Sequence, residues 1–238
     1  VLGNTLELIA KEKMGIVKKN CTLITTEERP KILKMFQTKC DKEKSKFVSI
    51  KVKGISSNEK NSAIAKKIGE FLNINKKAIE KGIKQTKLPC RFETIQESPH
   101  VIIDGAHNRI KLKKLAEDLK TIKYRKLIVV YGMVADKNVA QSLEEIAHLA
   151  DYIIFTRSLT LNAGRKTASM IEFKNIIKKL RTKAKIDYFL DPWHALEFGL
   201  TQTESSDCLV ITGSMYLTGS LREKWIDENY ILKNRKSF

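Results

Sequence analysis

The first part of this 238-residue chain alternates amphipathic segments with short apolar runs. Apolar residues at spacings of three and four predict helices over 4–19, 27–39, 58–72 and 76–85. Short β-branched or alternating runs between these helices predict strands over 21–26 and 47–54. In the segment 58–72 we expect the apolar residues to face inward, namely Ile64, Ala65, Ile68, Phe71 and Leu72.

The second part has a more regular rhythm. Continuous apolar runs predict strands over 100–105, 126–132, 151–156, 185–190 and 208–214. Amphipathic stretches between them predict helices over 108–120, 137–149 and 168–183, and two more that begin at Asp191-Pro192 and after Gly213. Apolar strands that alternate with helices are typical of a parallel sheet covered on both faces. We therefore predict an α/β fold with a mostly parallel sheet.

Pro89 interrupts the pattern between these two parts. We accordingly expect a first domain over 1–86, a linker over 87–91 and a second domain over 92–238.

The charge of the chain changes this picture little. Lysine and arginine number 45 against 27 acidic residues, which leaves a net charge of +18, and aromatic residues make up 7%. A nucleic-acid-binding surface is usually richer in arginine or in aromatic stacking platforms. The lysines are spread over most of the predicted helices, which favours a solvated lysine-rich surface over a nucleic-acid partner. Steering of a polyanionic small substrate stays open.

Other features restrict the compartment. The longest apolar run is far shorter than the roughly 18 residues that a membrane span needs, so we expect no membrane association. Cys21, Cys40, Cys90 and Cys208 lie far apart in the sequence and form no CxxC pair. This spacing indicates neither a zinc site nor a disulfide scaffold, and we expect a cytoplasmic protein.

Polar clusters follow three of the predicted strands, at 104–108, 132–137 and 212–214. Ligands of open parallel sheets bind beyond the carboxyl ends of the strands, so these clusters should converge on one edge. Asp104 offers an acceptor for hydroxyl groups, and His107 can donate a hydrogen bond or take up a proton. Ser214 opens a helix whose free N–H groups suit an anion.

Plainer structural interpretations exist for several residues in and around these clusters. Asn108 could simply cap the following helix with His107 exposed beside it, and Gly213 could serve only the geometry of a turn. Arg91, in the predicted linker, could reach a phosphate or be solvated, and Lys13 could be a surface lysine with its stem on apolar neighbours. No G-x-G-x-x-G or G-x-x-x-x-G-K-[ST] motif is present.

Four ordered segments resemble one known family. LGNTLELIAKEKMGIVK (2–18) is similar to LGxTLxxIAxEKxGIxK, and RFE followed by PHVIIDGAHN (91–108) to R-x-E…P-x-x-x-x-D-G-A-H-N. GMVADKN (132–138) resembles G-x-x-x-D-K-D, and ITGSMYLTGSLRE (211–223) resembles V-T-G-S-L-Y-L-V-G-x-x-R. These are the patterns of the folylpolyglutamate synthase and dihydrofolate synthase family, in the wider Mur ligase group.

The resemblance implies a fold and a reaction. The fold is the last part of a central ATPase domain (1–86) followed by a Rossmann-like C-terminal glutamate-ligase domain. In the reaction, ATP with Mg²⁺ phosphorylates a carboxylate of dihydropteroate or a folate, and the amino group of L-glutamate attacks the acyl phosphate.

The resemblance also implies roles for individual residues. Lys13 matches a lysine that is carbamylated and then acts as a carboxylate-like metal ligand. Asn61, Arg91 and Asp104 match nucleotide-binding positions. His107, as a catalytic and substrate-binding residue, and Ser214, as a substrate-binding residue, fall in motifs that face the glutamate site.

The sequence departs from the family pattern in ways that leave two hypotheses. The family's phosphate loop and acidic Mg²⁺ ligand would precede Val1, and GISSNEKN (54–61) replaces a stretch that contains G-x-H-Q. We therefore expect an incomplete ligase, inactive alone, whose missing N-terminal ATPase half is its partner. The alternative is a non-catalytic module retained for nucleotide or glutamate binding or for assembly.

Overall fold

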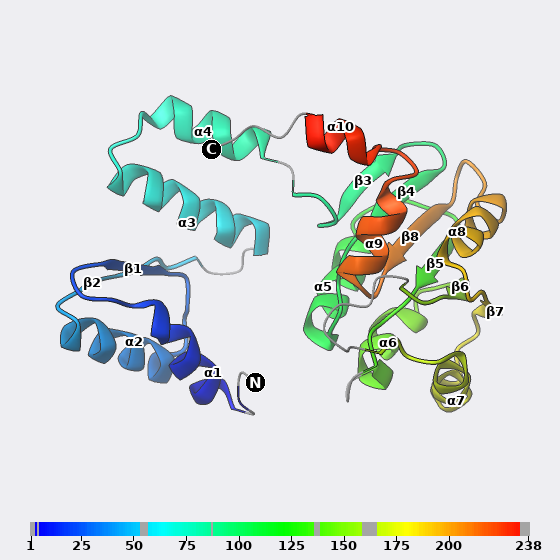
Figure 1. The fold of residues 1–238 in the computed structure, drawn as a ribbon, viewed down its shortest axis with the longest axis horizontal. Coiled ribbons are helices and arrows are strands. Elements are labelled where there is room, and N and C mark those ends of the chain that lie inside the picture. Colours follow the sequence, from blue (N-terminus) through cyan, green and yellow to red (C-terminus); the bar gives the residue numbers. More distant parts are fainter. Residues whose placement is uncertain are drawn as a thin grey trace. The chain divides into compact units, whose positions relative to one another are not determined.

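The computed structural model describes residues 3, 5–52, 57–86, 88–135, 139–158 and 166–233. The chain divides into two compact units, 1–86 and 87–238 (Figure 1). Among the helices of the described residues, none has the length and apolar character required to cross a membrane.

The first unit contains a two-stranded parallel sheet and several helices. Its elements are α1 (Leu6–Lys13), a 3-10 turn η1 (Met14–Ile16), β1 (Thr22–Thr25), α2 (Pro30–Lys42), β2 (Lys46–Ser49), α3 (Ser57–Phe71) and α4 (Lys76–Gln85). β1 pairs with β2 in parallel, with Leu23 opposite Phe47. Thr5 caps α1 by accepting a hydrogen bond from the N–H of Leu8, and Pro30 begins α2 with its φ already suited to a helix.

Two predicted elements of this unit are shorter than expected. The helix predicted over 4–19 ends at Lys13 and tightens into η1, because the backbone becomes extended at Val17. β2 ends at Ser49 instead of continuing to residue 54, because its partner β1 ends at Thr25. Residues 53–54 of that prediction lie outside the described residues.

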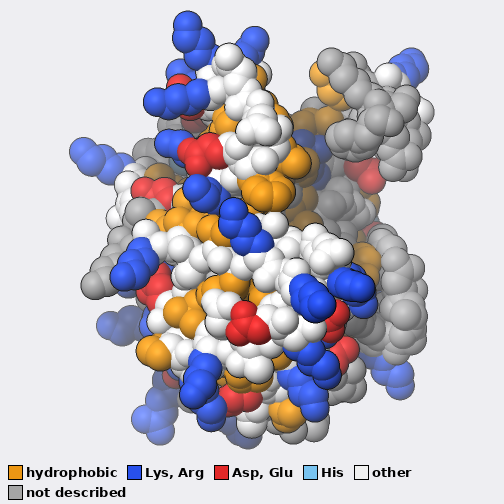
Figure 2. Space-filling model, turned by 90° about the vertical axis from the view of Figure 1, so that its left-hand side faces the viewer, with side chains coloured by type: hydrophobic (Ala, Val, Ile, Leu, Met, Phe, Trp, Pro, Cys, Tyr) orange, Lys and Arg blue, Asp and Glu red, His pale blue; other side chains and the backbone are white. Residues whose placement is uncertain are grey.

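The expectation that the apolar face of α3 is buried was largely wrong. Ile68, Phe71 and Leu72 have exposed fractions of 41%, 51% and 60%, and Ala65 is also exposed. A sheet of two four-residue strands has too small a surface to cover the apolar faces of the helices in this unit. Figure 2 shows hydrophobic side chains between the lysines and arginines on the face that it draws.

The second unit is built on a six-stranded sheet in the order β3-β4-β8-β5-β6-β7. Its strands are β3 (Glu93–Gln96), β4 (His100–Ile103), β5 (Leu127–Tyr131), β6 (Tyr152–Phe155), β7 (Lys185–Tyr188) and β8 (Cys208–Thr212). Its helices are α5 (Arg109–Leu119), α6 (Val139–Ala147), α7 (Met170–Leu180), α8 (Pro192–Thr201), α9 (Met215–Arg222) and α10 (Glu228–Lys233). All pairings are parallel except β3 with β4, so the predicted α/β fold with a mostly parallel sheet is confirmed.

The helices cover both faces of this sheet. α5, α6 and α7 pack on one face through Leu112, Leu143 and Phe173, whereas α8 and α9 pack on the other through Leu196 and Leu221. Every residue of β5, β6 and β8 is buried, because these strands have neighbours on both edges and helices on both faces.

The antiparallel edge strand β3 was not predicted. Its sequence, ETIQ, is short and mixed, so its pattern alone does not distinguish a strand from a loop. The helix α10 was not predicted either. It follows α9 after a few residues and ends at Lys233.

Candidate functional site

Three strand ends meet closely at the carboxyl edge of the six-stranded sheet. The N–H of Gly213 donates to the carbonyl of Ala106 over 3.0 Å, and the N–H of Gly132 donates to the carbonyl of Thr212 over 3.2 Å. Gly213 has φ +101°, and a Cβ atom there would lie 2.6 Å from the carbonyl oxygen of Gly132. Only glycine permits both this conformation and this close approach of the connections after β4, β5 and β8.

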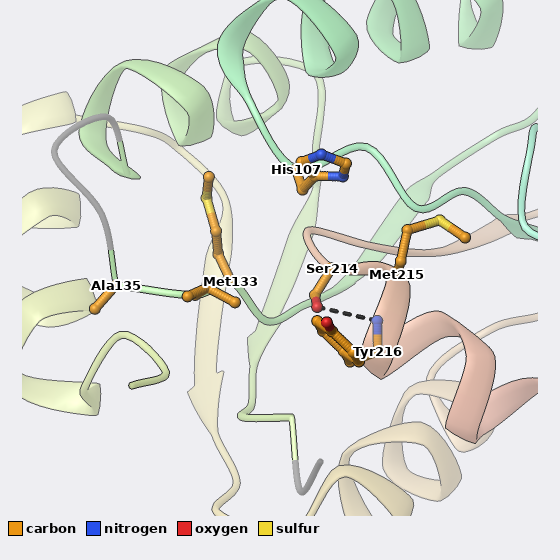
Figure 3. A pocket seen from close by; sticks show the side chains of 7 residues that line it. His107, Met133, Ala135, Ser214, Met215 and Tyr216 are labelled. Carbon is orange, nitrogen blue, oxygen red and sulfur yellow. Dashed lines mark hydrogen bonds between the residues drawn. The ribbon is translucent and has the colours of Figure 1, made fainter. Parts of the chain in front are cut away.

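A cavity of about 530 Å³ opens between these connections (Figure 3). It is lined by His107 after β4, by residues 133–135 after β5 and by residues 214–216 after β8. The predicted convergence of the three polar clusters is therefore confirmed for their described residues. Residues 136 and 137, which end the second cluster, lie outside the described part.

Ser214 forms the floor of this cavity at the start of α9. The residue is 2% exposed, and its Oγ accepts a hydrogen bond from the N–H of Tyr216 over 3.2 Å. Its hydroxyl hydrogen can still be donated to a bound group. Ser214 thus both caps α9 and offers a polar contact in the cavity.

His107 lies at the rim, held by hydrogen bonds on both ring nitrogens. Its Nδ1 is 2.8 Å from the carbonyl oxygen of Gly105, and its Nε2 is 3.3 Å from the Nζ of Lys111. A carbonyl oxygen only accepts and an ammonium group only donates. These partners therefore match a neutral imidazole with its hydrogen on Nδ1 and the lone pair of Nε2 directed to Lys111.

The carboxylate of Asp104 accepts hydrogen bonds from two backbone N–H groups. Its Oδ2 accepts from the N–H of Phe92 and its Oδ1 from the N–H of Ala106, each over 2.7 Å. Burial raises the pKa of Asp104, against the opposing effect of these two hydrogen bonds and of the charge of Arg91. The carboxyl group therefore fixes the turn that carries Arg91 and the turn that carries His107.

Arg91 lies on a tightly bent and well-braced turn. Its neighbours Cys90 and Phe92 have φ values of 56° and 45°, although neither is glycine. Glu93 accepts from the N–H of Cys90 over 2.8 Å and from the guanidinium of Arg222 on α9. Arg91 itself is exposed, so these contacts of Glu93 hold a turn whose Arg91 side chain lies in solvent.

The sequence interpretation missed Lys111, Glu93 and Arg222. Glu93 lies in the segment RFE and Arg222 in ITGSMYLTGSLRE, two of the segments that resemble the family patterns. Their place in these segments was the one signal in the sequence that could have identified them. The partnership of Glu93 with Arg222 joins residues 129 positions apart, which no local pattern reveals. Lys111 is one of several lysines on its helix and carries no sequence signal.

The remaining predicted residues lie in the first unit. Lys13 is the last residue of α1 and Asn61 lies on α3, and both are exposed. The apolar surroundings expected for Lys13 are thus limited, since Ala10 is the buried residue of α1. Within the described part of the chain, no group of three His, Cys, Asp or Glu side chains could hold a metal ion.

The sequence of the second unit matches a known domain. Residues 90–215 match the family described as Mur ligase, glutamate ligase domain. This match contains every residue that lines the cavity except Tyr216.

Curated and solved proteins extend the similarity to the first unit. A dihydrofolate synthase/folylpolyglutamate synthase of Bacillus subtilis is 26% identical over 266 residues, which cover 94% of this chain and 59% of that protein. A folylpolyglutamate synthase structure from Thermotoga maritima has a TM-score of 0.74 at 27% identity, with coverage of 95% and 59%.

A structure of Mycobacterium tuberculosis folylpolyglutamate synthase complexed with ADP and AMPPCP has the same fold. Its TM-score is 0.80 at 17% identity, and the match covers 96% of this chain and 61% of that one. The chain thus spans about three fifths of the length of these relatives. Because the glutamate ligase domain covers more than half of its residues, the chain belongs to the Mur ligase family.

Proposed function

We propose that this chain is part of an ATP-dependent ligase that joins L-glutamate to dihydropteroate or a folate. The observation that carries this proposal is the cavity at three converging strand ends, inside the region that matches a glutamate ligase domain. Relatives named for both synthase activities support the substrate class.

Two domains would contribute to this ligase. Residues 1–86 would belong to a central ATPase domain, residues 87–91 would link the domains, and residues 92–238 would form the glutamate ligase domain. The small parallel sheet of the first unit supports a partner, the N-terminal ATPase half. Parallel sheets are almost always larger and covered on both faces, so further strands supplied by the partner would extend the sheet of β1 and β2.

The reaction would proceed in two steps. A carboxylate oxygen of the pterin substrate attacks the γ-phosphorus of ATP, and ADP leaves. The amino nitrogen of glutamate then attacks the acyl carbon, and inorganic phosphate leaves. The ammonium group of glutamate must lose a proton before its nitrogen attacks, and the Nε2 of His107 is the acceptor at the cavity rim once Lys111 releases it.

The other residues would bind and orient the substrates. Ser214 would donate its hydroxyl hydrogen to a carboxylate of glutamate. Arg91 would contact a nucleotide phosphate, and Asp104 would act on the nucleotide site by holding the backbone of Phe92 next to it.

Lys13 and Asn61 would act from the first unit. Asn61 would contact the nucleotide, and Lys13, once carbamylated, would be one ligand of Mg²⁺, with further ligands from the N-terminal half. Bound Mg²⁺ would offset the negative charge of the phosphates. All four cysteines are free thiols, which suits a cytoplasmic enzyme.

Glutamate-dependent release of ADP tests this proposal. We expect no release from the 238-residue chain alone with ATP, Mg²⁺ and a folate or dihydropteroate. Co-expression with the part of the Bacillus subtilis relative that this chain does not match should produce it. Lys13→Ala and Arg91→Ala should each reduce the reconstituted activity, the latter by roughly one to two decades for a lost charge-assisted contact.

Three outcomes decide between the hypotheses. Activity that depends on glutamate and on Arg91 supports the ligase. Activity of the isolated chain would contradict the need for the N-terminal half. Glutamate or ADP binding without ligation in the reconstituted complex would favour the non-catalytic module.

A further inference from the structure

A group of cations lies at the start of α5, beside the cavity. Lys111 is in the first turn of this helix, where its backbone N–H donates to the capping Oδ1 of Asn108 over 3.0 Å. Its ammonium group reaches back to His107, with 3.3 Å between Nζ and Nε2. The Lys111 side chain is half-buried, in contrast to Lys113 on the same helix, which is exposed.

The surroundings of the Lys111 ammonium group are unfavourable for a positive charge. Burial lowers the pKa of Lys111, and the charge of Arg91 lowers it further. A lysine near the start of a helix also lies at the end where the helix dipole favours anions over cations. Such an arrangement costs stability, and a bound anion would offset this cost.

The nearby negative charge does not neutralise the two cations. Asp104 favours the charged form of Lys111, but both of its carboxylate oxygens already accept backbone N–H groups. Across the described residues, neither Arg91 nor Lys111 has a carboxylate within 4.0 Å. Two cations thus remain without an ion-pair partner beside a helix N-terminus.

We propose that Arg91 and Lys111 together bind a phosphate group, and that His107 holds the Lys111 amine until this group arrives. A phosphate carries close to two negative charges and three acceptor oxygens, which suits two cations better than a single carboxylate does. Arg91 provides a planar fork of donors and Lys111 a mobile point charge.

This inference rests on the proposed function for the identity of the phosphate. The group is either a phosphate of the nucleotide or the one carried by the acyl phosphate. In both cases, movement of Lys111 toward the phosphate frees the Nε2 of His107, which the second reaction step requires. Phosphate binding and proton acceptance would thereby be coupled through one lysine.

Calorimetric titration of the whole chain with pyrophosphate, ADP, inorganic phosphate and L-glutamate tests the site. We expect Lys111→Gln to weaken binding of pyrophosphate roughly tenfold or more. Lys113→Gln, an exposed neighbour of the same helix, should leave it unchanged, and Lys111→Arg should restore most of it. Circular dichroism and thermal melting verify that each variant is folded.

Comparison of the titrations with different ligands identifies the source of the phosphate. Loss of both pyrophosphate and ADP binding in Lys111→Gln assigns the site to the nucleotide. Loss of pyrophosphate and inorganic phosphate binding with unchanged ADP binding assigns it to the transferred phosphate. The proposal is overturned if Lys111→Gln weakens only glutamate binding, if it and Lys113→Gln behave alike, or if the wild-type chain binds none of the phosphates.

A second readout follows His107 directly. In ¹⁵N spectra, with the signal assigned by its absence in His107→Gln, pyrophosphate should shift the Nε2 resonance as Lys111 leaves it. An unchanged resonance at saturating pyrophosphate would contradict the coupling. Neither measurement uses ligase activity, so a failed reconstitution together with Lys111-dependent phosphate binding would refute the proposed reaction and keep the phosphate site.

Discussion

At the scale of single residues, Asp104 illustrates how burial and hydrogen bonding compete. Burial raises its pKa, while the N–H groups of Phe92 and Ala106 and the charge of Arg91 oppose the rise. The carboxylate therefore orders two turns at some cost in desolvation. These backbone partners are the reason why we propose that Asp104 acts on the nucleotide site through the turn that carries Arg91.

A pH dependence of stability follows from this raised pKa. Because the folded state binds a proton more tightly than an unfolded aspartate, whose pKa is 3.8, it gains stability at low pH. This contribution is lost as the pH rises from 3.8 through the raised pKa of the folded state. The free energy of unfolding of the wild type, relative to Asp104→Asn, should therefore fall over this range.

Urea titrations of both proteins at intervals between about pH 4 and about pH 7 measure this difference in the free energy of unfolding. The comparison cancels the contributions of the titratable groups that the two proteins share. A difference that rises with pH would contradict the prediction, because it would mean that folding lowers the pKa of Asp104.

At the scale of elements, the bent turn before β3 is joined to α9. Arg222 contacts Glu93 through two nitrogens at 2.8–3.2 Å, and the two side chains are only 13% and 18% exposed. Glu93 also accepts the N–H of Cys90. One ion pair thus connects the turn that carries Arg91 to α9, the helix that Ser214 caps.

We predict that Arg222→Ala lowers the free energy of unfolding by about 1.5–3 kcal/mol, the range for hydrogen bonds to charged groups. The half-buried Glu93 carboxylate would lose its partner, which adds to the cost. Arg222→Lys should retain part of the stability, because it keeps the charge but loses the paired contacts. Chemical denaturation measures both.

Lys224→Ala is the matched control for Arg222→Ala. Lys224 lies two residues further along the chain and is exposed, with no ion pair within the described part of the protein. A loss of stability as large in Lys224→Ala as in Arg222→Ala would show that the effect does not come from the Glu93 contact.

At the scale of the whole molecule, the two units differ in how much apolar surface they bury. The first unit has a few scattered buried apolar residues, whereas the second has two continuous apolar layers against its sheet. Large apolar side chains of α1 and α3 remain exposed, including Leu6, Leu8, Ile68 and Phe71. Burial of apolar surface is the main favourable contribution to stability, so the units should not be equally stable.

We predict that the chain unfolds in two transitions, with the first unit unfolding at the lower urea concentration. Both tryptophans, Trp193 and Trp225, lie in the second unit, so their fluorescence reports the second transition. Far-UV circular dichroism reports both transitions. Coincident curves from the two probes would contradict the prediction.

Much of the second unit follows from local pattern, and the reason is physical. A strand buried on both faces must be apolar throughout, as in LIVVY of β5 and CLVIT of β8, and such runs are visible in any sequence. β3 and the short helices lack this signature. The burial of α3 could not be predicted, because periodicity shows which residues share a face but not whether anything covers it.

The sequence by itself determined the alternation of strands and helices and the meeting of three polar clusters at one sheet edge, because parallel topology requires that edge to be shared. Only the tertiary structure decided which groups those clusters bring together. It gave Asp104 two backbone partners, directed Lys111 to His107 and paired Glu93 with Arg222. These contacts depend on the three-dimensional positions of side chains from separate turns and helices, which no local pattern encodes.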